Sequence, residues 1–263
     1  MRIRPAVAVV FGVTVLSVSV LPATAHAASP AAAGDTTFSK VVVNDGKDIV
    51  LGPTTRKTVT LTWTAKDPDG VLTSWAYLWH GPNTDDADGY LPSYLPSGAC
   101  TVSPTDRTTS TCEVSFVVDA ARALHRNTLA GKWNILAGAQ DATDDWTEID
   151  AAGTAQVKRS ATVTVNASPE PVTKGRTITV TGKLTRANWE SRTYTGYAAQ
   201  PVQLQFREKG STTYTTLKTV TSSGSGALKT TTKARTDGYF RFVFAGSGTT
   251  GPSTAAGDFV DVR

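Results

Sequence analysis

The stretch SATVTVNASPEPVTKGRTITVTGKL, residues 160–184, alternates apolar and polar residues on both sides of one turn. Valines alternate with threonines before the proline- and glycine-containing segment 169–175, and Ile178, Val180 and Leu184 alternate with polar residues after it. A period of two predicts β-strands with one apolar face, and proline and glycine end such strands. The stretch therefore predicts the first two strands of an antiparallel β-sandwich.

The same alternation continues on both sides of this stretch. Before it, roughly seven short strands with turn signals every 8 to 12 residues fit an immunoglobulin-like sandwich. After it, Phe240, Phe242 and Phe244 form one apolar row, and Val202 and Leu204 belong to another. The predicted fold class is all-β, with two tandem immunoglobulin-like antiparallel β-sandwiches at 36–159 and 160–263.

The N-terminus predicts export. Arg2 and Arg4 precede an apolar run at 6–20, and Ala25 and Ala27 are the small residues that a signal peptidase reads. The run is shorter than the roughly 20 residues of a membrane span. We expect a cleaved signal peptide at 1–27, a disordered leader at 28–35, a secreted product, and no membrane span.

Charge divides the chain. From 35 to 159 there are 11 lysines and arginines against 16 aspartates and glutamates, and from 160 to 263 there are 13 against 6. The two halves could steer and dock onto each other. Alternatively, the basic half meets an anionic surface such as a cell-wall polymer. No basic run is dense enough to indicate nucleic acid, so the expected partner is an extracellular protein or a cell-wall polymer.

Cys100 and Cys112 are the only cysteines. An exported chain with an even number of cysteines most simply pairs them. A structural disulfide is therefore predicted in the first sandwich.

The segments TDGYFRF at 236–242 and GYAAQPVQLQF at 196–206 carry a family resemblance. The second half resembles the Ig-like and carboxypeptidase-regulatory-like sandwich modules of secreted bacterial proteins, in which an Asp-Gly turn leads into an aromatic strand. The resemblance implies a non-catalytic accessory or binding role and assigns no site. Some two-domain secreted chains of this kind are described as calcium-binding.

Catalysis has little support in the sequence. Behind the predicted signal only His80 and His125 remain as histidines, and no nucleophile elbow, zinc-binding histidine pair or phosphate loop is present. We therefore expect a protein that is not an enzyme.

Acidic loops suggest a metal. In immunoglobulin topology the turn after the second strand and the loop before the last strand meet at one pole, and calcium prefers 6 to 8 oxygen ligands. A second acidic segment, Asp85, Asp86 and Asp88, lacks a full ligand pattern, and aspartates are also ordinary turn residues. The candidate Ca²⁺ ligands at the pole of the first sandwich are Asp67, Asp69, Asp141, Asp144 and Asp145.

Trp75, Tyr77 and Trp79 form an aromatic row on one predicted strand face. An exposed row of this spacing could stack on sugar rings, with Tyr90, Tyr94 or Trp146 extending it. The alternative is a core row covered by the loop 81–98, because large aromatic residues are usually buried in good part.

The loop 185–200 is expected to face the first sandwich. Trp189 and Tyr197 would then pack between the two sandwiches, and Arg186 and Arg192 would oppose the aspartates at 85–88. The function predicted from sequence is secreted, non-catalytic binding, with calcium as a candidate ligand of the first sandwich. The alternative is a carbohydrate- or cell-wall-binding accessory protein.

Overall fold

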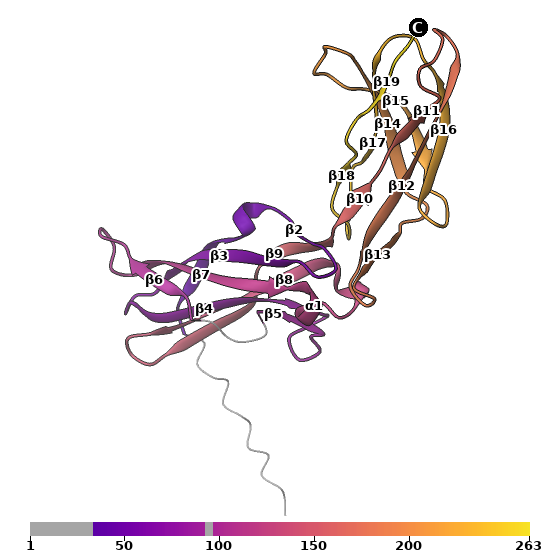
Figure 1. Cartoon of the computed structure of the whole chain (residues 1–263). Helices are drawn as coiled ribbons and strands as arrows, with labels where there is room; N and C mark the ends of the chain where they lie inside the picture. The colour runs from indigo at the N-terminus through magenta and orange to yellow at the C-terminus, as the bar shows by residue number, and fades with distance from the viewer. Residues whose placement is uncertain (1–33, 93–96) are drawn as a thin grey trace, which may run out of the picture. The chain divides into compact units, whose positions relative to one another are not determined.

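The computed structural model describes residues 34–92 and 97–263, in which strands far outnumber the few short helical segments (Figure 1). The predicted signal peptide and most of the leader lie outside the described residues. The all-β prediction is confirmed. The alternating residues form four sheets, in which many strands bury one face and leave the other to solvent.

The first sandwich consists of a four-stranded and a five-stranded sheet. Their orders, β1-β3-β7-β6 and β2-β9-β8-β4-β5, correspond to the A-B-E-D and A′-G-F-C-C′ orders of immunoglobulin domains. All pairs are antiparallel except β2 with β9. The strands are β1 Thr37–Val43, β2 Ile49–Leu51, β3 Arg56–Lys66, β4 Val71–His80, β5 Gly89–Leu91, β6 Ala99–Val102, β7 Thr109–Asp119, β8 Gly131–Asp141 and β9 Trp146–Arg159.

Trp63 and Trp133 are the largest buried side chains between these two sheets. The indole nitrogen of Trp63 donates to Ser74 Oγ at 2.8 Å, and Ser74 Oγ donates to the Gly138 carbonyl at 2.7 Å. The buried indole N–H and hydroxyl are thus both satisfied. The predicted disulfide is present, and it joins Cys100 on β6 to Cys112 on the neighbouring strand β7.

Three short helical segments join these strands. One is the single helical turn α1, Ala120–Ala123, and Asp119 caps it by accepting a hydrogen bond from the Ala121 amide. The other two segments are 3₁₀ turns, η1 Asn44–Gly46 and η2 Asn127–Leu129.

The second sandwich pairs two five-stranded sheets. In one, β12 pairs with β10, β11, β13 and β16; in the other the order is β15-β14-β17-β18, with β19 also on β17. These pairings correspond to an A-B-E sheet and a C′-C-F-G sheet. The strands are β10 Ala161–Val163, β11 Asn166–Ser168, β12 Thr177–Asn188, β13 Thr193–Gly196, β14 Pro201–Glu208, β15 Thr215–Thr221, β16 Ala227–Lys233, β17 Gly238–Phe244, β18 Ser253–Thr254 and β19 Asp258–Val260.

The core of the second sandwich follows the predicted rows. Phe240, Phe242 and Phe244 are all buried, together with Val202 and Leu204. The alternating residues before the 169–175 segment form two strands, β10 and β11, that pair with successive parts of β12. The period of two is thus sufficient for the core, and the break between the two strands is a local irregularity.

The segment 185–200 is not a loop. It continues β12 to Asn188 and returns as β13, so it forms a hairpin. Trp189 follows β12, is 1% exposed, belongs to the first hydrophobic core, and donates from its indole nitrogen to the Leu51 carbonyl at 3.4 Å. Tyr197 instead packs in the second core, with its ring 5.7 Å from that of Phe244.

The expected pairing of the aspartates at 85–88 with Arg186 and Arg192 is wrong. Asp88 lies beside His80 and Arg126, and Arg186 stacks over Tyr197 at 3.9 Å. Asp88 and Arg186 thus each have a partner on their own sandwich, and no salt bridge joins the two groups among the described residues.

Candidate functional site

An acidic cluster lies at one end of the first sandwich. Asp67 and Asp69 occupy the turn between β3 and β4, and Asp141 ends β8, opposite Val71 at the start of β4. One carboxylate oxygen from each aspartate lies within 4.8 Å of the others. The strand order thus brings together three of the five aspartates that the sequence suggested.

The acidic cluster consists of Asp67, Asp69 and Asp141. Two of its three residues are nearly inaccessible to water. Asp67 is 1% exposed and Asp141 is 3% exposed, whereas Asp69 is exposed. The Thr36 hydroxyl donates to Asp67 Oδ2 at 2.6 Å, and the Asp69 amide donates to Asp67 Oδ1 at 2.9 Å. These bonds fix the orientation of the Asp67 carboxylate toward its neighbours.

Asp141 is held by the loop that follows it. The amides of Thr143 and Asp145 each donate to Asp141 Oδ1 at 2.8 Å. Burial would raise the pKa of Asp141, but the hydrogen bonds from Asp145 and Thr143 outweigh it and lower that pKa. The carboxylate is therefore ionised at neutral pH, as a metal ligand must be.

The other two suggested aspartates stay outside the cluster. Asp144 has a positive φ of 75°, and its Oδ1 accepts a hydrogen bond from Gln140 Nε2 at 2.6 Å. Asp145 Oδ1 accepts from the Trp146 amide at 3.0 Å. Both carboxylates therefore accept hydrogen bonds within the β8–β9 turn and do not belong to the group of three.

Asp35 is a neighbour that sequence reasoning missed. Its pKa is raised, first by partial loss of hydration and then by the charge of Asp67, with a smaller effect of Asp69. Asp35 lies just before β1, whose Thr37 pairs with Lys66. Only the β1–β3 register places it near Asp67, and no local motif marks that register.

The second acidic segment, 85–88, does not form such a group among the described residues. The backbone amide of Asp86 donates to Asn83 Oδ1 at 2.8 Å, and Asn83 Nδ2 donates to Asp86 Oδ2 at 3.1 Å. Asp88 contacts His80 Nδ1 through one oxygen and Arg126 through the other at 3.7 Å. This segment is therefore a loop held by its own polar contacts.

The aromatic row Trp75, Tyr77 and Trp79 lies on the face of β4 opposite the core residues Ala76 and Leu78. Trp79 is only 4% exposed, and its indole nitrogen donates to the Asp150 carbonyl at 2.6 Å. Trp75 and Tyr77 are half-buried. The row is thus covered at one end only.

Neighbouring residues explain this gradient. The Thr84 hydroxyl donates to Asp150 Oδ2 at 3.2 Å, which closes the 81–88 loop over Trp79. Tyr90 is 40% exposed, and its ring centroid lies 6.0 Å from that of Tyr77. Burial, followed by the nearby charge of Glu148, raises the pKa of Tyr77. Tyr94, another suggested extension of the row, lies outside the described residues.

A groove of about 770 Å³ adjoins this row. Tyr77 and Tyr90 line it together with the apolar residues Leu91 and Val117. Its charged lining residues are Arg56, Asp88, Asp119 and Arg122, and His125 also lines it. The groove therefore combines aromatic rings with hydrogen-bonding groups, a composition that suits a polar ligand with flat apolar faces.

Comparisons with known proteins leave the family open. No family model matches the chain, and no curated protein matches it. Among solved structures, latent PorU from Porphyromonas gingivalis is 14% identical with a TM-score of 0.27; the match covers 86% of this chain and 20% of that one. The mouse nectin-like molecule 4 ectodomain is 15% identical with a TM-score of 0.29, covering 88% and 65%.

The D00-D0 domain of intimin is 14% identical with a TM-score of 0.26, covering 84% of this chain and 98% of that one. Such similarity transfers no function, and the immunoglobulin-like assignment follows from the strand orders above. In the part of the chain that the structure describes, no helix is both long and apolar enough to cross a membrane.

Proposed function

We propose that this chain is a secreted, non-catalytic binding protein whose first sandwich binds calcium through Asp67, Asp69 and Asp141. The observation that carries the proposal is the mutual approach of three carboxylate oxygens within 4.8 Å, two of them on almost fully buried residues. Relationship to the carboxypeptidase-regulatory-like modules of secreted bacterial proteins is part of the same proposal.

The spacing of the acidic cluster fits a calcium ion. Calcium–oxygen distances are about 2.3 to 2.6 Å, so two oxygens on opposite sides of one ion lie about 5 Å apart or less. Three carboxylates supply three to six of the 6 to 8 ligands, and water or backbone carbonyls supply the others. Like charges so close repel each other, and a divalent cation relieves that repulsion.

The test is thermal unfolding of the full chain in EDTA and in calcium. At a calcium concentration 100 times Kd, binding stabilises the folded state by about 2.7 kcal/mol, which raises the Tm by roughly 5 to 10 °C for a unit of this size. Asp69→Asn removes one of the three negative charges of the acidic cluster, and no hydrogen bond to the Asp69 side chain is present among the described residues. We expect this variant to lose most of the calcium-dependent shift.

Asp144→Asn is the matched control, because Asp144 lies in the same acidic end but outside the group of three. It keeps the shift if the proposed ligands are correct. An unchanged Tm at millimolar calcium, or equal shifts in both variants, contradicts the calcium proposal.

Carbohydrate binding is the second candidate, and the groove beside Tyr77 and Tyr90 favours it. Partly exposed aromatic rings stack on sugar rings, while the neighbouring arginines and aspartates match hydroxyl groups. Tyr90→Ala should weaken binding of a soluble polysaccharide in isothermal titration calorimetry. Tyr194→Ala serves as control, because Tyr194 is similarly exposed, 44% against 40%, and does not line the groove. Equal affinities of the two variants would argue against this site.

A further inference from the structure

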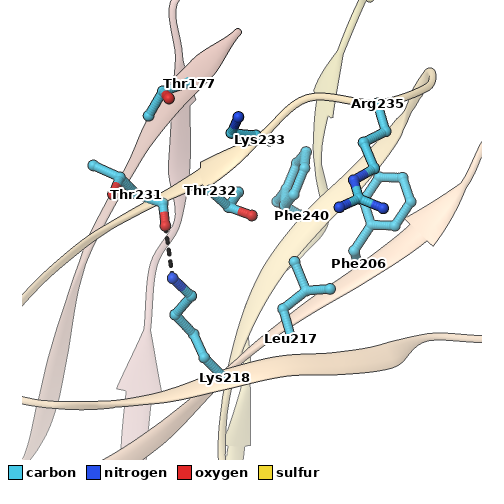
Figure 2. A pocket seen from close by; sticks show the side chains of 9 residues that line it. All are labelled: Thr177, Phe206, Leu217, Lys218, Thr231, Thr232, Lys233, Arg235 and Phe240. Atoms are coloured by element: carbon cyan, nitrogen blue, oxygen red, sulfur yellow. Dashed lines mark hydrogen bonds between the residues drawn. The ribbon is translucent and has the colours of Figure 1, made fainter. Parts of the chain in front are cut away.

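The second sandwich carries a groove of about 630 Å³, and Figure 2 shows the side chains that line it. Phe206, Leu217 and Phe240 are its apolar lining residues, and Leu217 is 41% exposed. Its polar lining residues are Thr177, Lys218, Thr231, Thr232, Lys233 and Arg235. The groove thus has an apolar part and a cationic part within reach of one ligand.

Two edge strands flank this groove. Within the described chain, β15 pairs only with β14, and β16 pairs only with β12. Each strand therefore has one side of its backbone free to pair with another strand. One free acceptor is already used, because Lys218 Nζ on β15 donates to the Thr231 carbonyl on β16 at 2.7 Å (Figure 2).

The cations of the groove have no acidic partners nearby. Across residues 34–92 and 97–263, no salt bridge involves Lys218, Lys233 or Arg235, and the groove lining contains no carboxylate. The second half of the sequence also carries 13 basic residues against 6 acidic ones. The groove is therefore electrostatically complementary to an anionic ligand.

Protection against aggregation explains part of this arrangement. Lysines on an edge strand discourage non-specific pairing with other strands. It does not explain an exposed leucine beside half-buried Phe206, since an apolar patch at an open edge favours association rather than preventing it. Lysines together with an exposed apolar patch favour a strand that carries both acidic and apolar side chains over other strands.

We propose that this groove binds an extended acidic segment of a partner protein by strand addition to β15 or β16. The free backbone groups pair with the segment, alternate apolar side chains enter toward Leu217 and Phe206, and acidic side chains meet Lys233 and Arg235. Lys218 exchanges the Thr231 carbonyl for a carboxylate, and a hydrogen bond in which donor and acceptor carry opposite charges is the stronger one. A glycan lacks the backbone pattern that two edge strands offer, so a peptide is the better fit.

The test uses the full chain and a fluorescein-labelled hexapeptide of alternating aspartate and valine, followed by fluorescence anisotropy. We expect saturable binding that weakens with added salt. The double variant Lys233→Glu with Arg235→Glu should lower the affinity at least tenfold. Lys229→Glu, on the same strand β16 but outside the groove lining, should leave the affinity within about twofold.

Two further peptides separate strand addition from simple charge attraction. One has three aspartates followed by three valines, and the other is methylated at alternate backbone nitrogens. Both should bind at least tenfold more weakly than the alternating peptide, because each disrupts either the alternation or the backbone hydrogen bonds. Equal binding of all three peptides overturns the proposal, as does absence of binding at millimolar peptide.

Anionic polymers provide the last comparison. If polygalacturonate or polyphosphate binds through Lys233 and Arg235 while the peptide does not, the occupant is a polymer and the proposal is wrong. The peptide-binding proposal rests on the proposed binding function, because it names a partner for it. It does not depend on calcium binding by the first sandwich. The measurements are made in EDTA and repeated with Asp69→Asn, so failure of the calcium proposal is seen separately.

Discussion

Gly138→Ala should destabilise the first sandwich by about 1.5 to 2 kcal/mol. Gly138 on β8 pairs with Trp75 on the neighbouring strand β4. A Cβ at Gly138 would overlap three atoms of the Trp75 indole. The Trp75 side chain must then move away. An aromatic side chain buries about 150 to 250 Å², and half-buried Trp75 stands to lose roughly 100 Å². At about 25 cal/mol per Å² this loss is about 2.5 kcal/mol, and the better strand propensity of alanine returns about 0.5 to 1 kcal/mol.

Urea unfolding of the full chain measures this change, with tryptophan fluorescence reporting the native state. The emission of Gly138→Ala should shift to longer wavelength as Trp75 gains water contact. Gly224→Ala is the control, because a Cβ there meets no atom within 4 Å and the residue has no positive φ. In a Trp75→Ala background, Gly138→Ala should cost nothing, so the two substitutions couple. If Gly138→Ala is as stable as Gly224→Ala with unchanged emission, the packing argument is refuted.

Three other substitutions test the fold. Replacing Cys100 and Cys112 by serine should cost about 3 kcal/mol in urea unfolding, as expected for a loop of this size; no loss would mean that the bond does not form. Trp189→Ala should cost about 3 to 5 kcal/mol and increase hydrogen exchange in β2; a change confined to the second sandwich would contradict its place in the first core. Hydrogen bonds from Thr108 and Thr109 lower the pKa of Asp106 to about 2. Its stabilisation is therefore present above about pH 4, is lost toward pH 2, and disappears in Asp106→Asn; an NMR midpoint near 4 would refute it.

The strands could be predicted because burial of one face fixes the register of a whole strand. Phe240, Phe242 and Phe244 illustrate this, since all three lie in the core as the alternation indicated. Trp189 illustrates the limit. It follows the last residue of β12 and has no alternating neighbours, so its burial in the other core depends on how the hairpin after β12 is placed. Nothing within a single strand carries that information.

The acidic end could be predicted only in part. Topology alone brings the β3–β4 turn to the end of β8, and Asp67, Asp69 and Asp141 meet there as expected. Asp144 and Asp145 lie further along the same loop, but their carboxylates accept hydrogen bonds within the turn. Aspartates in turns satisfy local backbone and side-chain donors, and a sequence does not show which of them are left for a ligand.

The aromatic row shows why an apolar strand face cannot be classified from its own residues. β4 is apolar on both sides, and whether its second face is covered depends on β8, β9 and the 81–88 loop. That loop is hydrogen-bonded to Asp150 and covers Trp79. The indole of Trp75 packs on Gly138 with one face, and its other face remains open to solvent. Trp79 is thereby removed as a stacking platform. A sugar chain bound at this face would contact Tyr77 and Tyr90 first, so Tyr90→Ala should affect binding more than Trp79→Phe.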